Sequence, residues 1–463
     1  MIDLLINNVA IITVDPQRRI YRQGTIAIDK GIIINLDPQP GVEKKFSAKT
    51  VVDGTHFLAM PGLTNAHMHL PQVLMRGVYD NIEAMDKLKN YTWPIQGCYD
   101  EQDALISTRL GLLEMIKSGT TSFLSTGLHP RYGIPAILDT ILESGMRAVV
   151  SKYVMDIAGY ALDESAIHPG MWETGEDSKR ISVDLIQQWD IAGDGRLHVW
   201  ISPRSVGGCS LDLLKWTVIT AREYGVGITA HWSEVQNNVD YTLAEFGLRP
   251  VQLAEKIGML GPDVTFAHGI YLDDEEMDLL ARTRTNIVHC PICNSKLAMG
   301  VARVPQMLRK GVNVAMGNDG MGVNNTADMF REMRTMILLH RATQNNPLFP
   351  TAGEAIEMAT INGARAMMAD KVVGSLEVGK RADIILINMH QPHLEPLHDL
   401  VSPIAWAVNG SDVDTAIIDG KIVMQNRRVL TLDEEKILAD AENIKDKILY
   451  NAGVCPQHVW PEL

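Results

Sequence analysis

The stretch Asn65-Ala66-His67-Met68-His69 places two imidazoles at the end of a predicted strand. Residues two apart in a strand point to the same side, so both rings can reach one metal ion. A lone His-x-His pair is a weak signal, but further apolar runs end in the same kinds of residue. These runs are Thr229-Ala230-His231 with Glu234 three residues on, Phe266-Ala267-His268, and Met316-Gly317-Asn318-Asp319. Imidazoles and carboxylates at four strand ends are typical of a catalytic site at the C-terminal face of a barrel.

Around this stretch, from about Pro61 to Val373, short β-rich runs alternate with longer helical patterns, which indicates βα units on a parallel sheet. Predicted strands lie at residues 147–150, 198–201, 227–230, 264–267, 286–289 and 312–316. Roughly 310 residues of this alternation favour an α/β fold of the (β/α)8 TIM-barrel type over two doubly wound domains. No glycine-rich dinucleotide fingerprint or Walker loop follows a strand, so a Rossmann-type oxidoreductase is not indicated.

Both ends of the chain carry the signature of a small β domain. Apolar runs lie at residues 4–14, 25–28, 32–36, 382–387 and 416–424, with turns at Asp29-Lys30-Gly31 and Asp419-Gly420. One β-sandwich built from both ends is the economical interpretation. The expected organisation is residues 1–60 and 372–425 in this domain, residues 61–371 in the barrel, and residues 426–463 as a C-terminal helical segment.

Composition excludes several classes of partner. Of 463 residues, 42 are Lys or Arg and 56 are Asp or Glu, which gives a net charge of −14. No basic run stands out, so neither nucleic acid nor an anionic membrane is an expected partner. The N-terminus lacks the pattern of a secretory signal, and the 5 cysteines are too sparse for a disulfide framework. We expect a soluble, cytoplasmic protein with reduced thiols.

The chain resembles the amidohydrolase superfamily in motifs that span nearly its whole length. These motifs are residues 60–69, Ser118-Gly119-Thr120-Thr121, His231-Trp232-Ser233-Glu234, Ala267-His268-Gly269, residues 288–297, Gly317-Asn318-Asp319-Gly320, residues 362–366 and residues 374–383. The subgroup it resembles holds triazine chlorohydrolases together with guanine, cytosine and adenosyl-homocysteine deaminases. The overall texture is most similar to the chlorohydrolases and their xenobiotic-hydrolysing relatives.

The resemblance implies a set of ligands and catalytic groups. His67, His69, His231 and Asp319 would hold one divalent ion, zinc, iron or cobalt, which would lower the pKa of a water molecule. Glu234, with Asp319, would accept the proton of that water and pass it to the leaving group. His268 would stabilise the developing negative charge or orient the nucleophile.

Departures from the family pattern bear on the metal count and the substrate. Lys152, the one candidate for the carboxylated lysine of binuclear members, lies in the third rather than the fourth expected strand, so one metal is favoured. In Trp93-Pro94-Ile95-Gln96 the carboxylate that nucleoside deaminases use for the ribose is replaced by Gln96, as in triazine-type relatives. Trp93, Gln96, His289, Asn318 and Arg204 are candidate substrate contacts. Cys290 and Cys293 are expected to be structural or to line the substrate pocket.

The leading hypothesis is a metal-dependent hydrolase of a small, neutral nitrogen compound such as a triazine, phenylurea or thiocarbamate. The leaving group would be an amine, a chloride or an amide- or thiocarbamate-type group. The alternatives are a deaminase of a purine or pyrimidine base or nucleoside and, more remotely, a non-catalytic scaffold. We expect the substrate to be neutral because the sequence shows no obvious cluster of Arg or Lys. A homo-oligomer, dimeric or higher, is expected.

Overall fold

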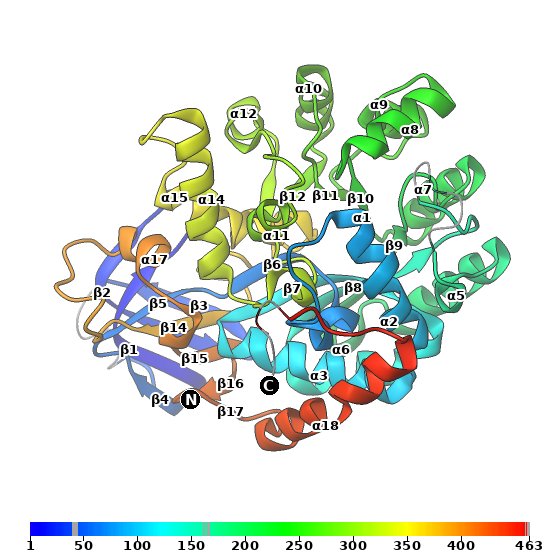
Figure 1. Ribbon diagram of the computed structural model, residues 1–463. Coiled ribbons are helices and arrows are strands. Elements are labelled where there is room, and N and C mark those ends of the chain that lie inside the picture. Colours follow the sequence, from blue (N-terminus) through cyan, green and yellow to red (C-terminus); the bar gives the residue numbers. More distant parts are fainter. Residues whose placement is uncertain (39–44, 161–162, 164–166, 459, 461–463) are drawn as a thin grey trace.

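Eight parallel strands form a nearly closed barrel in the computed structural model, which describes residues 1–38, 45–160, 163, 167–458 and 460 (Figure 1). In pairing order they are β13 (Val314–Met316), β12 (Asn286–His289), β11 (Val264–His268), β10 (Ile228–Trp232), β9 (Leu197–Pro203), β8 (Arg147–Val154), β7 (Thr120–Leu128) and β6 (Leu63–Met68). Main-chain pairing between Met68 and Asp319 brings the chain after β13 to β6. The predicted (β/α)8 fold is confirmed.

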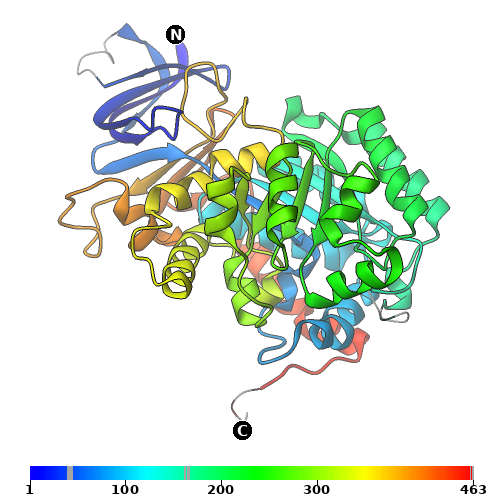
Figure 2. The same ribbon diagram turned by 90° about the horizontal axis from the view of Figure 1, so that it is seen from above.

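Helices surround the barrel (Figure 2). The longer ones are α3 (Glu101–Lys117), α4 (Ile134–Ser144), α5 (Gly175–Trp189), α7 (Leu211–Tyr224), α8 (Gln236–Phe246), α10 (Asp274–Thr283) and α14 (Met329–Gln344). Shorter ones are α1 (Ala84–Lys87), α2 (Trp93–Cys98), α6 (Ala192–Gly195), α9 (Pro250–Lys256), α11 (Pro291–Lys296), α12 (Val304–Lys310), α13 (Met321–Asn324), α15 (Ala352–Met358), α16 (Ile361–Ala366) and α17 (Ser402–Trp406). Barrel strands such as β7 are buried along their whole length, as expected when helices cover a parallel sheet.

The two ends of the chain meet in a second sheet, which lies beside the barrel in both ribbon views. Its strands are β1 (Ile2–Ile12), β2 (Ile20–Asp29), β3 (Ile32–Asp37), β4 (Ala48–Asp53) and β5 (Phe57–Pro61) from the N-terminal end, and β14 (Ile384–Asn388), β15 (Val413–Ile418), β16 (Lys421–Gln425) and β17 (Arg428–Val429) from the C-terminal end. The Asp419-Gly420 hairpin is confirmed, because both residues have positive φ and join β15 to β16. The predicted small β domain is therefore present.

The barrel closes through a backbone approach that only glycine permits. A Cβ on Gly317 would lie 2.7 Å from the carbonyl oxygen of His67, too close for any other residue. Asp319 follows two residues later and donates its N–H to the same carbonyl, at 3.0 Å. This contact places the end of β13 directly against the His67 segment of β6.

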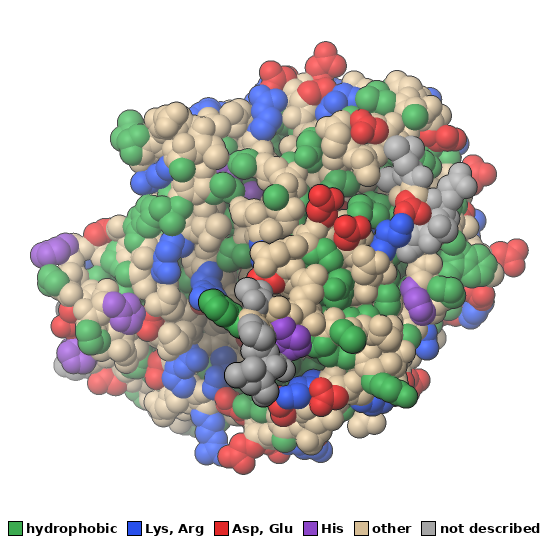
Figure 3. Space-filling view, in the orientation of Figure 1, with side chains coloured by type: hydrophobic (Ala, Val, Ile, Leu, Met, Phe, Trp, Pro, Cys, Tyr) green, Lys and Arg blue, Asp and Glu red, His purple; other side chains and the backbone are tan. Residues whose placement is uncertain are grey.

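The chain after the small domain ends in α18 (Glu434–Ala452), which packs against α3 and α2 of the barrel. Residues 459 and 461–463 of the predicted C-terminal segment lie outside the described residues. Among the helices that the structure describes, none has both the length and the apolar character needed to cross a bilayer. The face shown in Figure 3 carries acidic and basic side chains interspersed over the described surface.

Candidate metal centre and substrate cavity

Four of the predicted site residues converge at the C-terminal ends of the barrel strands. His67 lies on β6, His231 on β10, His268 at the end of β11 and Asp319 after β13. One ligand atom from each lies within 4.8 Å of the others, and all four residues are buried. The strand-end pattern read from the sequence therefore corresponds to one cluster.

His69, the fifth predicted member, contacts this cluster from one side. Its Nε2 lies 3.0 Å from Oδ1 of Asp319 and 3.2 Å from Nε2 of His231. Its Nδ1 lies 3.0 Å from the carbonyl oxygen of Thr126, which can only accept a hydrogen bond. Nδ1 therefore carries the proton, and the lone pair of Nε2 points into the cluster.

The donor atoms of the cluster fit a divalent cation. Neither ring nitrogen of His67, nor Nδ1 of His231, nor Nε2 of His268 has a hydrogen-bond partner among the described residues, although all are buried. Unpartnered buried nitrogens are costly, and a cation that accepts one lone pair from each ring removes part of that cost. Burial lowers the pKa of His67 to about 4, so its imidazole is neutral, as metal ligation requires. The site fits one divalent metal ion.

Asp319 is oriented by its neighbours on both oxygens. Its φ of 62° lies in the left-handed region, which is uncommon for a residue with a Cβ and clusters at functional sites. Burial acts to raise its pKa, but the nearby imidazoles of His67 and His69 lower it well below the usual range. Oδ2 accepts a hydrogen bond from Sγ of Cys293 at 2.7 Å, which leaves Oδ1 facing the histidines. Burial raises the pKa of this thiol well above its ordinary value, so it stays a donor.

Glu234 follows β10 by two residues and faces the same cluster. Its Oε2 accepts a hydrogen bond from the hydroxyl of Tyr160 at 3.0 Å, and its Oε1 lies 3.7 Å from Nε2 of His268. Nδ1 of His268 lies 3.0 Å from Oδ1 of Asn294, which fixes the ring. The carboxylate of Glu234 is thus buried, held at one oxygen, and next to the candidate metal ligands.

A narrow cavity opens onto this cluster. It is lined by His69, His231, Glu234 and Asp319 together with Gln72, Lys87, Leu88, Trp93, Gln96, Tyr153, Tyr160 and Arg204. The guanidinium of Arg204 lies over three of these rings, 5.3 Å from Trp93, 4.9 Å from Tyr153 and 5.5 Å from Tyr160. Three of the five predicted substrate contacts, Trp93, Gln96 and Arg204, therefore line the cavity.

Comparison with known proteins places the chain in a family. The sequence model of the Amidohydrolase family matches residues 58–423. The chain belongs to the amidohydrolase family.

Its relatives are deaminases by name. The amidohydrolase is 35% identical to a 5'-deoxyadenosine deaminase of Methanosarcina acetivorans, over 98% of this chain and 100% of that protein. It is 36% identical to a 5-methylthioadenosine/S-adenosylhomocysteine deaminase of Moorella thermoacetica, over 90% and 93%. A zinc-bound adenosine deaminase from Xanthomonas campestris superposes with a TM-score of 0.90 at 26% identity, over 97% of this chain and 99% of that one.

The chlorohydrolase resemblance extends to the fold. Atrazine chlorohydrolase from Arthrobacter aurescens, in complex with zinc, superposes with a TM-score of 0.86 at 22% identity, over 96% and 100% of the two chains. The family and the curated relatives make this chain a metal-dependent hydrolase of carbon–nitrogen bonds. They give no support to the preference for a xenobiotic substrate.

Two predicted substrate contacts of this amidohydrolase lie away from the cavity lining. Nε2 of His289 faces Nε2 of His340 at 3.2 Å. The side chain of Asn318 accepts from Asn65 at 2.8 Å and donates to Glu332 at 3.2 Å, so it joins β6 to the Asp319 loop. Both side chains are fully buried and bonded to other polar side chains.

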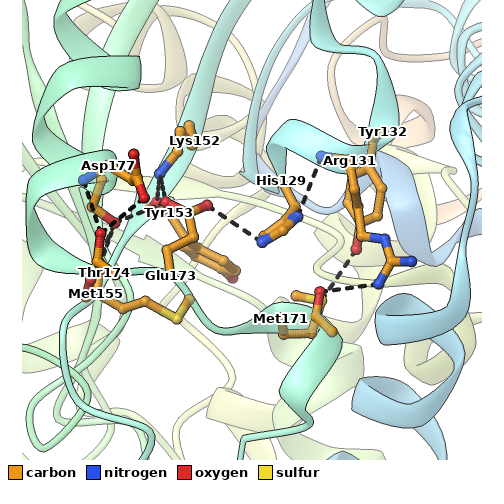
Figure 4. A network of polar contacts seen from close by, with 12 residues as sticks. His129, Arg131, Tyr132, Lys152, Tyr153, Met155, Met171, Glu173, Thr174 and Asp177 are labelled. Carbon is orange, nitrogen blue, oxygen red and sulfur yellow. Dashed lines mark hydrogen bonds and ion pairs between the residues drawn. The ribbon is translucent and has the colours of Figure 1, made fainter.

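Lys152, considered for a second metal, is directed at Glu173 (Figure 4). Tyr153 lines the cavity, so its strand neighbour Lys152 faces the opposite side of β8. There Nζ lies 2.5 Å from Oε2 of Glu173 and 2.6 Å from the carbonyl oxygen of Tyr153. His129 approaches Glu173 from the other side, 3.3 Å from Oε1. The lysine is occupied by an ion pair, in agreement with a single metal.

Five residues that line the cavity were not among the sequence predictions: Gln72, Lys87, Leu88, Tyr153 and Tyr160. Cys293, expected to be structural or to line the substrate pocket, donates a hydrogen bond to Asp319. Strand alternation could have indicated Tyr153, because it lies near the C-terminal end of β8. Lys87 ends the short helix α1 and Tyr160 lies in a loop, so no periodic pattern marks either residue.

Proposed function

We propose that this amidohydrolase is a hydrolytic deaminase of a planar, amino-substituted nitrogen heterocycle. Water replaces the exocyclic amino group, and ammonia leaves. The observation that carries the proposal is the position of Glu234, buried beside the histidine cluster and inside a cavity with the aromatic side chains Trp93, Tyr153 and Tyr160. Aromatic rings favour planar substrates, and the curated relatives named above are deaminases of adenine nucleosides.

The proposed ligands are His67, His69, His231 and Asp319, with His268 close enough to share the site. When bound, a divalent ion supplies Lewis-acid activation of water. The hydroxyl of Tyr160 donates a hydrogen bond to Oε2 of Glu234. Oε1 is therefore the oxygen that is free to take a proton from water. Glu234 then returns that proton to the departing amine, and His268 stabilises negative charge that develops on the substrate.

Gln96 limits the class of substrate that the cavity can bind. Its side-chain amide makes no hydrogen bond with a described residue and lines the cavity, so it is free to contact the substrate. An amide is a poorer partner than a carboxylate for the paired hydroxyls of a ribose. We therefore propose a heterocyclic base or base-like compound rather than a ribonucleoside.

The test is ammonia release by the metal-loaded protein from guanine, cytosine, adenine, aminotriazines and 5'-deoxyadenosine. We expect ammonia from at least one free base, and Glu234→Gln should lower kcat by about 10²–10⁴-fold with its metal content unchanged. Glu255→Gln, an exposed ion-pair residue, is the matched control. Chloride, thiol or substituted amine as the product without ammonia would overturn the proposal, as would full activity of Glu234→Gln.

A cytoplasmic homo-oligomer stays a prediction, and light scattering coupled to gel filtration measures its size. Exposed apolar side chains on α18, Leu438 and Tyr450, are candidates for such a contact. A monomer at micromolar concentration would contradict it.

A further inference from the structure

Two cationic side chains that line the cavity, Lys87 and Arg204, form no ion pair with a described residue. Lys87 and Arg204 are each 5% exposed, and both line the cavity with the metal cluster. Neither side chain makes a hydrogen bond or an ion pair with any residue that the structure describes. A buried charge without a partner is expensive, so a protein retains one chiefly where function uses it.

The aromatic contacts of Arg204 do not satisfy its donors. Trp93, Tyr153 and Tyr160 lie against the guanidinium and hold it by cation–π contact. The five N–H groups lie in the guanidinium plane, and none of them has a hydrogen-bond partner among the described residues. The guanidinium is therefore held among three rings with its N–H donors unused, and such donors suit a planar, bidentate anion.

Burial acts to lower the pKa of Lys87, and the nearby acidic groups, Asp319 and Glu234 among them, raise it, but neither carboxylate forms an ion pair with Lys87 or Arg204. Oε2 of Glu234 is held by Tyr160, and Asp319 faces the histidines. With a divalent ion in the cluster, the charges of these two carboxylates are balanced by the ion. The two cations remain uncompensated in a chain whose net charge is −14, so attraction for an anion is a local property of this cavity.

We propose that Arg204 and Lys87 form an anion subsite, and that the substrate is an aminated heterocycle that carries a carboxylate. This inference rests on the proposed deaminase function and adds the substrate's charge to it. The carboxylate takes the donor edge of Arg204, and the ammonium of Lys87 supplies the second charge. The sequence analysis predicted a neutral substrate because no cluster of Arg or Lys is visible in the sequence. Lys87 and Arg204 lie 117 positions apart, 204 − 87, and only the fold brings them to one cavity.

The experiment compares matched substrates. Aminated pyrimidines, purines and triazines are each offered to the zinc-loaded full chain as the carboxylate, as the carboxamide and as the unsubstituted parent, and ammonia is measured. We expect kcat/KM for the carboxylate to exceed that for its carboxamide by about 30-fold or more, because one unpaired buried charge costs at least about 2 kcal/mol. Arg204→Gln and Lys87→Met should each reduce this ratio toward one, mainly through KM. Arg282→Gln, an exposed arginine in a surface ion pair, should leave it unchanged.

The outcomes separate the two proposals. Equal turnover of carboxylate and carboxamide refutes the anion subsite and leaves the deaminase function intact. If no compound releases ammonia, the deaminase function fails, and calorimetry with the zinc-loaded Glu234→Gln protein decides the subsite. There the carboxylates should bind at least about tenfold tighter than the carboxamides, and Arg204→Gln in the same background should abolish the difference. Persistence of the difference would place the anion on the metal and refute the subsite.

Discussion

Replacing Lys152 by Met should destabilise the protein by about 3 kcal/mol, because it leaves Glu173 as a buried charge without its cation. The side chains of Lys152 and Glu173 are 2% and 7% exposed, and their atoms lie 2.5 Å apart. Breaking such a buried pair from one side costs about 3–5 kcal/mol. The hydrogen bond from Ser178 to Oε2 of Glu173, at 2.9 Å, remains and favours the lower end of that range.

The loss should also depend on pH. Burial, and next the charge of Lys152, lowers the pKa of His129 to about 3. Without Lys152 this pKa rises, so the folded variant binds more protons than the folded wild type as the pH falls. A folded state that binds more protons gains stability at lower pH. The stability gap between wild type and Lys152→Met should therefore narrow from pH 8 to pH 5.

Urea unfolding followed by circular dichroism measures the gap, with two lysine controls. Lys215→Met, an exposed position on α7, should change stability by less than about 0.5 kcal/mol. The double variant Lys152→Met with Glu173→Gln should regain most of the loss, because no unpaired charge remains. A Lys152→Met protein as stable as wild type, or a double variant less stable than the single one, would refute the reasoning.

The remaining predictions concern the cluster and its supports. Removal of metal by a chelator should abolish turnover and lower Tm, and added zinc should restore both; retained activity in metal-free protein would contradict the metal-dependent mechanism. Tyr160→Phe should lower kcat by about 5- to 10-fold through loss of one hydrogen bond to Glu234, with metal content unchanged as the check on its specificity. Cys293→Ala should weaken zinc affinity by about 10- to 100-fold, measured by competition with a chelator, because Oδ2 of Asp319 loses its donor; unchanged affinity would show that the thiol does not orient the ligand.

The parts of the site that sequence reasoning predicted are those that local geometry determines. His67 and His69 end one strand, and His231, His268 and Asp319 end or follow others, so the βα alternation alone brings them to one face of a barrel. The same local logic located the Asp419-Gly420 hairpin. Strand alternation and turn type depend on a few neighbouring residues, so these features can be predicted from the sequence.

The features of the site that could not be predicted depend on which distant residue a buried side chain contacts. Lys87 and Lys152 are both buried lysines, but Lys152 meets Glu173 on the outer side of β8, whereas Lys87 faces a cavity without a described partner. Nothing in the residues around either lysine distinguishes the two, because their partners come from distant segments. Removing Lys152 strands the buried charge of Glu173, whereas Lys87 has no described ion-pair partner to strand, so Lys87→Met should leave stability unchanged or raise it, while Lys152→Met lowers it. That opposite response would identify Lys87 as a residue kept for binding at a cost in stability, and a loss of stability in both variants would contradict it.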